Sequence, residues 1–127
     1  MNDEKMMELQ SINEYLEKLQ GQMSKMQENL LELNSISEAL ASLQNLKGEQ
    51  SAFLPLASGI FVKGMLKPDS TVMMNVGQGV VVEKNITEAI ALIGKQKKNL
   101  ESIWEKADKQ FDELVEKAQS LQKEIEG

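Results

Sequence analysis

Residues 9–33 read LQSINEYLEKLQGQMSKMQENLLEL, and in this stretch an apolar residue returns at alternating steps of three and four. All eight positions of the series are apolar: Leu9, Ile12, Leu16, Leu19, Met23, Met26, Leu30 and Leu33. A repeat that averages 3.5 residues keeps one stripe of a helix turned toward a partner helix, which is the condition for a coiled coil. The stretch therefore predicts a long coiled-coil helix.

The stripe continues with one irregular step. Three further apolar residues extend it: Ile36, Leu40 and Leu43. The step from Leu33 to Ile36 is three residues where four were due, and such a stammer locally overwinds a coiled coil. Gly48 then supplies the glycine that often ends a helix. We predict a first helix over residues 1–47.

A second heptad series fills the C-terminal third of the chain. Its stripe positions are Ile86, Ile90, Ile93, Lys97, Leu100, Trp104, Ala107, Phe111, Leu114, Ala118, Leu121 and Ile125. Only Lys97 interrupts it with a charge. Asn85, followed three residues later by Glu88, resembles a capping box. We predict a second helix over residues 85–127.

Two helices of similar length, separated by a short insert, are expected to fold back antiparallel. In the register that this suggests, Leu46 lies near Ile86 and Leu9 lies near residue 123. On the solvated faces, oppositely charged residues at i and i+4 are expected to pair. These pairs are Glu14–Lys18, Glu105–Lys109 and Glu113–Lys117.

The same register places Lys97 opposite the stammer around Ser35, with Ser37 and Gly94 in one layer. This layer could act as a hinge. It could also be a tolerated polar position at which the lysine stem covers the core, and this simpler interpretation is favoured.

Residues 48–84 have a different character. Four short segments, 51–56, 60–66, 71–76 and 80–83, are apolar and rich in β-branched or aromatic residues, and glycine or proline separates them. They predict four strands in two hairpins, with turns at 67–70 and at Gly77–Gln78–Gly79. The latter is only a G-x-G, so it indicates a hairpin turn and not a nucleotide site.

These strands are almost continuously apolar, which is typical of strands covered on both faces. About 33 residues cannot cover both faces of their own sheet, so other subunits are expected to supply the cover. The expected interface residues are Phe53, Leu54, Ile60, Phe61, Val62, Val72, Met74, Val76, Val80 and Val82. The fold class is mainly α with a small β island, in one domain over residues 1–127. Two long helices form an antiparallel coiled coil and are joined by two hairpins.

Composition excludes several kinds of function. The 127 residues include no cysteine, no histidine and no arginine, and the net charge is −6. Disulfides, thiolate metal sites and imidazole catalysis are therefore absent, and neither a metal nor a cofactor is expected. The acidic balance argues against nucleic acid and anionic membranes as partners. No apolar stretch could cross a bilayer and no signal peptide is apparent, so a cytoplasmic protein is expected.

Short motifs in and around the middle segment resemble the α-class subunit of prefoldin, over essentially the whole chain. They are Leu54–Pro55–Leu56, Phe61–Val62–Lys63–Gly64, Val76–Gly77–Gln78–Gly79, Val82–Glu83–Lys84 and Glu88–Ala89–Ile90. Two hairpins mark the α class in that family, whereas β-class subunits carry one.

The resemblance implies an assembly of two α and four β subunits, joined through their hairpins into a double β-barrel with six coiled coils hanging from it. It implies a chaperone that holds non-native proteins at the tips of the coils. The clients then pass to a group II chaperonin without ATP. The family offers no catalytic residues to transfer, so no enzyme is expected.

The tip residues expected to bind clients are Met6, Met7, Leu9, Ile12, Leu114, Leu121 and Ile125. Met6 and Met7 fall off the regular stripe, and methionine suits promiscuous apolar contacts. For Leu9, Ile12, Leu121 and Ile125, the alternative is that they are ordinary stripe residues closed against each other.

Two other functions stay open at this stage. One is a structural or adaptor coiled coil that binds no clients. The other is a periplasmic trimeric holdase of similar outline, against which the acidic charge and the missing signal sequence count.

Overall fold

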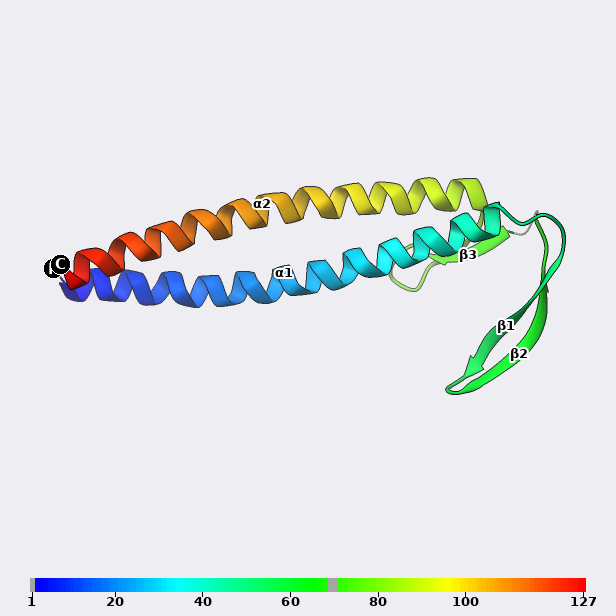
Figure 1. Cartoon of the computed structure of the whole chain (residues 1–127), viewed down its shortest axis with the longest axis horizontal. Helices are drawn as coiled ribbons and strands as arrows, with labels where there is room; N and C mark the ends of the chain where they lie inside the picture. Colours follow the sequence, from blue (N-terminus) through cyan, green and yellow to red (C-terminus); the bar gives the residue numbers. More distant parts are fainter. Residues whose placement is uncertain (1, 69–70) are drawn as a thin grey trace. The chain divides into compact units, whose positions relative to one another are not determined.

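The computed structural model describes residues 2–68 and 71–127 and contains two long helices and four strands (Figure 1). Their bounds are α1 Asn2–Gln44, β1 Gln50–Ala57, β2 Ile60–Leu66, β3 Thr71–Asn75, β4 Val81–Asn85 and α2 Ile86–Glu126. The predicted fold class is confirmed, and each strand lies within two residues of its predicted position. Part of the predicted turn at 67–70 lies outside the described residues.

The chain divides into two compact units. The terminal unit comprises residues 2–32 and 97–127, and the hairpin unit comprises residues 33–96. Each unit has its own small hydrophobic core.

The terminal unit is an antiparallel pair formed by the first part of α1 and the last part of α2. Its core centres on Leu19, Met23 and Ala107, with Trp104 and Phe111 packed against them. Every predicted stripe position within the described residues of both helices is buried or half-buried. The heptad interpretation is therefore confirmed position by position.

The level at which the helices pair differs from the prediction. Lys117 Nζ lies 3.3 Å from Glu8 Oε1, and Gln110 Nε2 donates a 3.1 Å hydrogen bond to Tyr15 Oη. Lys117 and Gln110 therefore lie seven residues before the α2 positions that the predicted register places near Glu8 and Tyr15. At the end of the unit the difference is three positions, since Lys5 pairs with Glu124 at 3.4 Å. In the terminal unit the predicted register is therefore wrong, because a shift of about one heptad leaves the same stripe facing inward. In the hairpin unit, Leu40 clusters with Ala89 and Ile93, in agreement with the predicted register.

The charge pairing differs as well. Lys117 pairs across the two helices with Glu8 and not with Glu113 four residues earlier. Among the described residues, an ion pair at i,i+4 spacing joins Lys84 to Glu88 at 3.8 Å, across the start of α2.

In the hairpin unit, the core centres on Leu40, Ala89 and Ile93. Val72 and Met74 of β3 pack against this cluster, so that one face of the β3–β4 hairpin rests on the helices. Ala89 retains no exposed surface. A small side chain at this position lets the strand come close to α2.

Both hairpins are antiparallel. In β1–β2, Leu54 pairs with Val62, and the register shifts between Pro55 and Ala57. In β3–β4, the predicted Gly77–Gln78–Gly79 turn is confirmed, because all three residues have positive φ. The Val76 amide donates to the Val80 carbonyl at 2.9 Å and closes the turn.

The predicted start of α2 is confirmed and the predicted end of α1 is wrong. Asn85 Oδ1 accepts a 2.8 Å bond from the Glu88 amide, and Asn85 Nδ2 donates to Glu88 Oε1 at 2.6 Å. Helix α1 ends at Gln44, and Gly48 (φ +110°) lies four residues beyond it. The left-handed glycine thus redirects the chain toward β1 and does not cap the helix.

Candidate functional site

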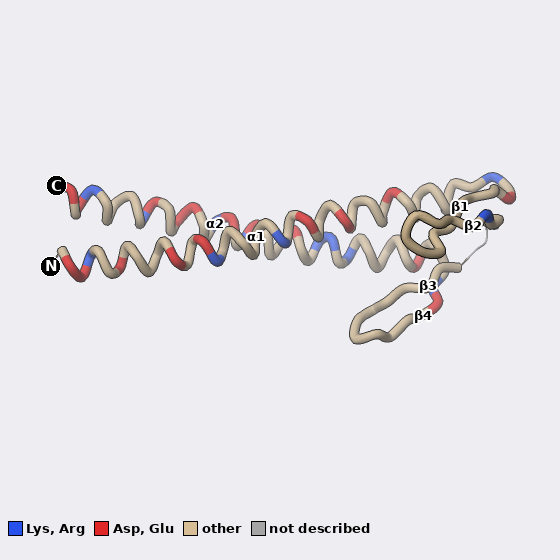
Figure 2. Tube along the Cα trace, turned by 90° about the horizontal axis from the view of Figure 1, so that it is seen from below, with Lys and Arg blue, Asp and Glu red and all other residues tan. Residues whose placement is uncertain are grey.

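Most of the large apolar side chains that the chain leaves exposed lie in the two hairpins. We call this set the hairpin surface: Phe53, Leu54, Leu56, Ile60, Phe61, Val62, Met65, Met73, Val76, Val80 and Val81. Charged residues follow the two helices, whereas the tips of the hairpins carry none (Figure 2). The hairpin surface is therefore apolar and largely uncharged.

The β1–β2 hairpin exposes apolar side chains on both faces. Phe53 and Phe61, on one face, are 72% and 60% exposed. Leu54 and Val62, which pair across the strands on the other face, are 42% and 48% exposed. Gly64 accommodates Leu54, since a Cβ added there would lie 2.9 Å from Leu54 Cδ1. Two apolar faces on a two-stranded ribbon require cover from outside the hairpin.

The β3–β4 hairpin leaves one face open, on which Met73 and Val81 are exposed beside polar residues such as Glu83. Val72 and Met74, two predicted interface residues, pack on the chain's own helices instead, and Val82 is half-buried. The prediction that other subunits supply all of the cover is therefore wrong for this face. The other predicted interface residues are exposed. The sequence reasoning missed Leu56, Met65, Met73 and Val81, although each lies in a predicted strand.

The free end of the terminal unit holds the second candidate site. Met6 and Met7 are 54% and 70% exposed. The other five predicted tip residues face the partner helix: Ile12 and Leu121 are buried, and Leu9, Leu114 and Ile125 are half-buried. Of the seven predicted tip residues, all of which the structure describes, Met6 and Met7 are the two that stay exposed.

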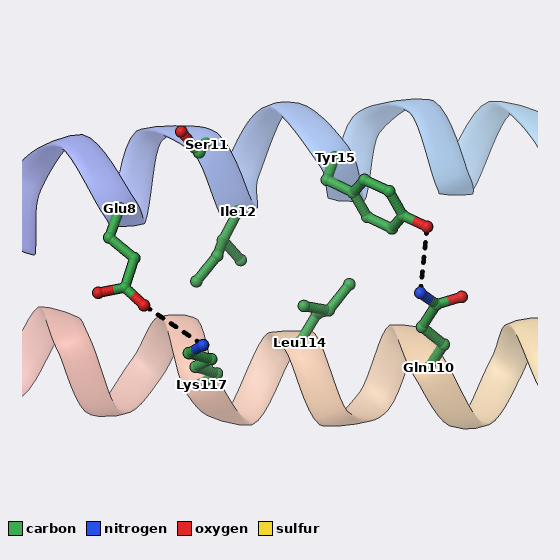
Figure 3. Close-up of a pocket in the computed structure, with 7 residues that line it drawn as sticks. All are labelled: Glu8, Ser11, Ile12, Tyr15, Gln110, Leu114 and Lys117. Atoms are coloured by element: carbon green, nitrogen blue, oxygen red, sulfur yellow. Dashed lines mark hydrogen bonds and ion pairs between the residues drawn. The ribbon is translucent and has the colours of Figure 1, made fainter.

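A shallow depression of about 400 Å³ lies on the side of the terminal unit, inward from Met6 and Met7 along α1 (Figure 3). Ile12 and Leu114 point toward one another in it. The Glu8–Lys117 ion pair and the Tyr15–Gln110 hydrogen bond bridge the helices to either side. These two exposed polar contacts flank an apolar floor. Sequence reasoning missed Tyr15 and Gln110, which lie next to the stripe and not on it.

The described residues offer little catalytic chemistry. Within the described residues, 2–68 and 71–127, no three His, Cys, Asp or Glu side chains come together as a metal site, and no polar side chain is buried. None of the helices in these ranges is long and apolar enough to cross a membrane. The arrangement can offer apolar contact surfaces, at the hairpins and at the free end.

Two long helices joined by two antiparallel hairpins, which expose apolar side chains, define the class of coiled-coil protein to which the chain belongs. The family model for Prefoldin (prefoldin subunit) matches residues 12–127, and the chain therefore belongs to the prefoldin family. This is a family of chaperone subunits that assemble with one another.

Two relatives with known names are both α subunits. Prefoldin subunit alpha of Methanobrevibacter smithii is 39% identical over 67 residues, which are 51% of this chain and 46% of that protein. Prefoldin subunit alpha of Archaeoglobus fulgidus is 27% identical over 122 residues, 96% of this chain and 89% of that protein. The resemblance to the α class is therefore confirmed.

Two solved structures share the fold. A cryo-EM structure of filamentous prefoldin from Methanocaldococcus jannaschii superposes with a TM-score of 0.74 at 21% identity and covers 96% of this chain and 98% of that chain. The crystal structure of the prefoldin β subunit from Thermococcus strain KS-1 gives a TM-score of 0.68 at 21% identity, over 98% and 88% of the two chains.

Proposed function

We propose that this chain is the α subunit of an ATP-independent holdase, which captures unfolded proteins at its coil ends and transfers them to a group II chaperonin. It acts in the cytoplasm, needs no cofactor and catalyses no reaction. The observation that carries the proposal is that Met6 and Met7 at the free end stay exposed while the stripe residues beside them are closed against the partner helix.

Assembly is the first step. The hairpin surface carries the chain into a complex with β-class subunits, as two α and four β chains. This step is supported by the apolar side chains that β1–β2 exposes on both faces. Covering such a surface with a partner contributes about 25 cal/mol for each Å² of apolar area. Edge strands left open would otherwise favour aggregation.

Client capture is the second step. Met6 and Met7 lie in the first two turns of α1, beside the ion pairs that hold this end of the coil. The flexible, polarizable thioether adapts to apolar segments of differing shape, which suits a holdase for many clients. Opening of the last turns would add Leu9 and Ile125 to this surface.

The experiment compares two exposed sites on the same helix. A photo-crosslinking residue replaces Met7 in one variant and Leu31, which is 64% exposed, in the other. Both are assembled with a β-class partner and offered an unfolded client. Crosslinks from position 7 that exceed those from position 31 support capture at the free end. Equal yields at the two positions would refute it.

A structural adaptor without client binding is the alternative, and the closure of five of the seven tip residues favours it. A complex that assembles through the hairpins but never slows client aggregation would establish that alternative.

A further inference from the structure

The methionines of this chain fall into protected and exposed sets. The sequence contains eight methionines and no cysteine, so thioethers are its only sulfur groups. Met23 is 8% exposed and lies in the core of the terminal unit, and Met26 packs against the same core. Met6 and Met7, by contrast, are more than half exposed. Oxidation of a thioether follows its accessibility.

We propose that Met6 and Met7 form an oxidant-sensitive modification site, at which sulfoxide formation by a hydroperoxide switches off client capture. The inference rests on the proposed capture of clients at this end. It assigns to the site a regulation by oxidation that a leucine pair at the same positions could not provide.

The chemistry is a two-electron oxygen transfer. The thioether sulfur attacks one oxygen of hydrogen peroxide, so that an S–O bond forms and the O–O bond breaks. The released hydroxide takes up the proton of the transferred oxygen and leaves as water. Sulfur is oxidised to the sulfoxide while the peroxide is reduced. A methionine sulfoxide reductase reverses the step with two thiol electrons, forming a disulfide and water.

The surroundings of the two methionines allow oxidation to change binding without unfolding the coil. The neighbouring side chains Lys5 and Glu8 form the ion pairs with Glu124 and Lys117 that join the helices. Neither methionine belongs to the core cluster of the terminal unit. A sulfoxide at these positions therefore replaces an apolar surface by a strongly polar one, and leaves the contacts that close the helices in place.

The effect on capture follows from desolvation. A client segment that covers a sulfoxide must remove water from a strong hydrogen-bond acceptor, whereas covering a thioether costs nothing comparable. Because the bound surface stays partly hydrated, only part of this desolvation cost applies, and the pair of sulfoxides is expected to weaken client affinity about tenfold.

The test uses the complex assembled with its β-class partner and titrated with hydrogen peroxide. Peptide mass mapping follows each methionine, and client binding is measured in parallel. The expected result is that Met6 and Met7 oxidise well before Met23, that client affinity falls about tenfold, and that a sulfoxide reductase restores it. The variant Met6→Leu/Met7→Leu, whatever its client affinity before treatment, should show the same affinity after oxidation.

A matched control separates the site from other exposed methionines. Met65 and Met73, 58% and 66% exposed in the free chain, belong to the hairpin surface that assembly covers. The variant Met65→Leu/Met73→Leu should remain as sensitive to peroxide as the unmodified chain. If it were protected while the Met6→Leu/Met7→Leu variant were not, the inference would be overturned. The β subunits are the same in every sample, so oxidation of their own methionines cancels in the comparison.

A further variant distinguishes the failure of this inference from the failure of the proposed function. Met6→Gln/Met7→Gln places polar groups at the site without oxidation. If this variant binds clients as tightly as the unmodified chain, the proposed capture surface itself is wrong. If the glutamines weaken binding but complete conversion of both methionines to sulfoxide does not, capture stands and the oxidation switch is refuted.

Discussion

Truncation of one aromatic side chain on the hairpin surface, Phe53→Ala, should weaken assembly with β-class subunits strongly. Phe53 is 72% exposed in the free chain, on a hairpin whose two faces both carry apolar groups. The matched control is Leu31→Ala. Leu31 is 64% exposed, so it has a similar apolar surface, but it lies on α1 outside the hairpins.

The magnitude follows from the exposed area of Phe53. A phenylalanine side chain buries roughly 150–250 Å², of which a partner could cover roughly 110–180 Å² at this exposure. At about 25 cal/mol per Å², this contributes about 3–4.5 kcal/mol to association. The alanine that remains keeps part of this gain, so the loss should be about 2–3 kcal/mol, or roughly 30- to 150-fold in the dissociation constant.

Native mass spectrometry or sedimentation across a titration with the β-class partner would measure this change, and circular dichroism would verify that the helices persist. The Leu31→Ala variant should assemble with unchanged affinity. If Phe53→Ala assembled as tightly as the unmodified chain, or if both variants lost affinity equally, then β1–β2 would not be the assembly surface.

Three further predictions concern stability, and urea or thermal unfolding at a fixed protein concentration measures each. Leu40→Ala, in the core of the hairpin unit, should lower the free energy of unfolding by about 2–3 kcal/mol, whereas Leu31→Ala should change it by less than about 0.5 kcal/mol; equal losses would contradict the assigned stripe. Asn85→Ala removes the cap of α2 and should cost about 1 kcal/mol, and no loss would show that the cap contributes nothing. Gly77→Ala forces a side chain into φ +122° and should cost at least about 1 kcal/mol, whereas Gly21→Ala, in open space on α1, should stabilise by a similar amount; effects of the same sign would refute the turn geometry.

The elements that sequence predicts well here are those whose information is local. Heptad spacing places each stripe residue, because it depends only on the 3.5-residue period of a helix in a coiled coil. The Gly77–Gln78–Gly79 turn and the Asn85 cap are likewise decided by a few neighbouring residues with specific backbone preferences. These predictions needed no knowledge of what lies across the fold.

The pairing level of the helices and the end of α1 depend on contacts between distant parts of the chain. A heptad stripe looks the same after a shift of one heptad, so Glu8 could meet residue 124 or Lys117 with its apolar neighbours equally buried. The end of α1 at Gln44 was missed because Gly48 satisfies the glycine signal of a helix end while serving a turn toward β1. Local patterns do not distinguish these uses.

The two hairpins also differ in how much of their apolar surface is buried within the chain. Val72 and Met74 rest on Leu40, Ala89 and Ile93, and one face of β3–β4 is therefore satisfied within the chain. The β1–β2 hairpin leaves Phe53, Leu54, Phe61 and Val62 exposed on its two faces.

An isolated two-stranded hairpin is marginally stable in water, so β1–β2 gains more from a partner than β3–β4 does. Each β1–β2 side chain that a partner covers contributes to the free energy of association. The side chains of Val72 and Met74 contribute instead to the folding stability of the subunit. Substitutions in the two hairpins should therefore separate. Those in β1–β2 should lower affinity for partner subunits, and those at Val72 or Met74 should first lower the stability of the chain itself.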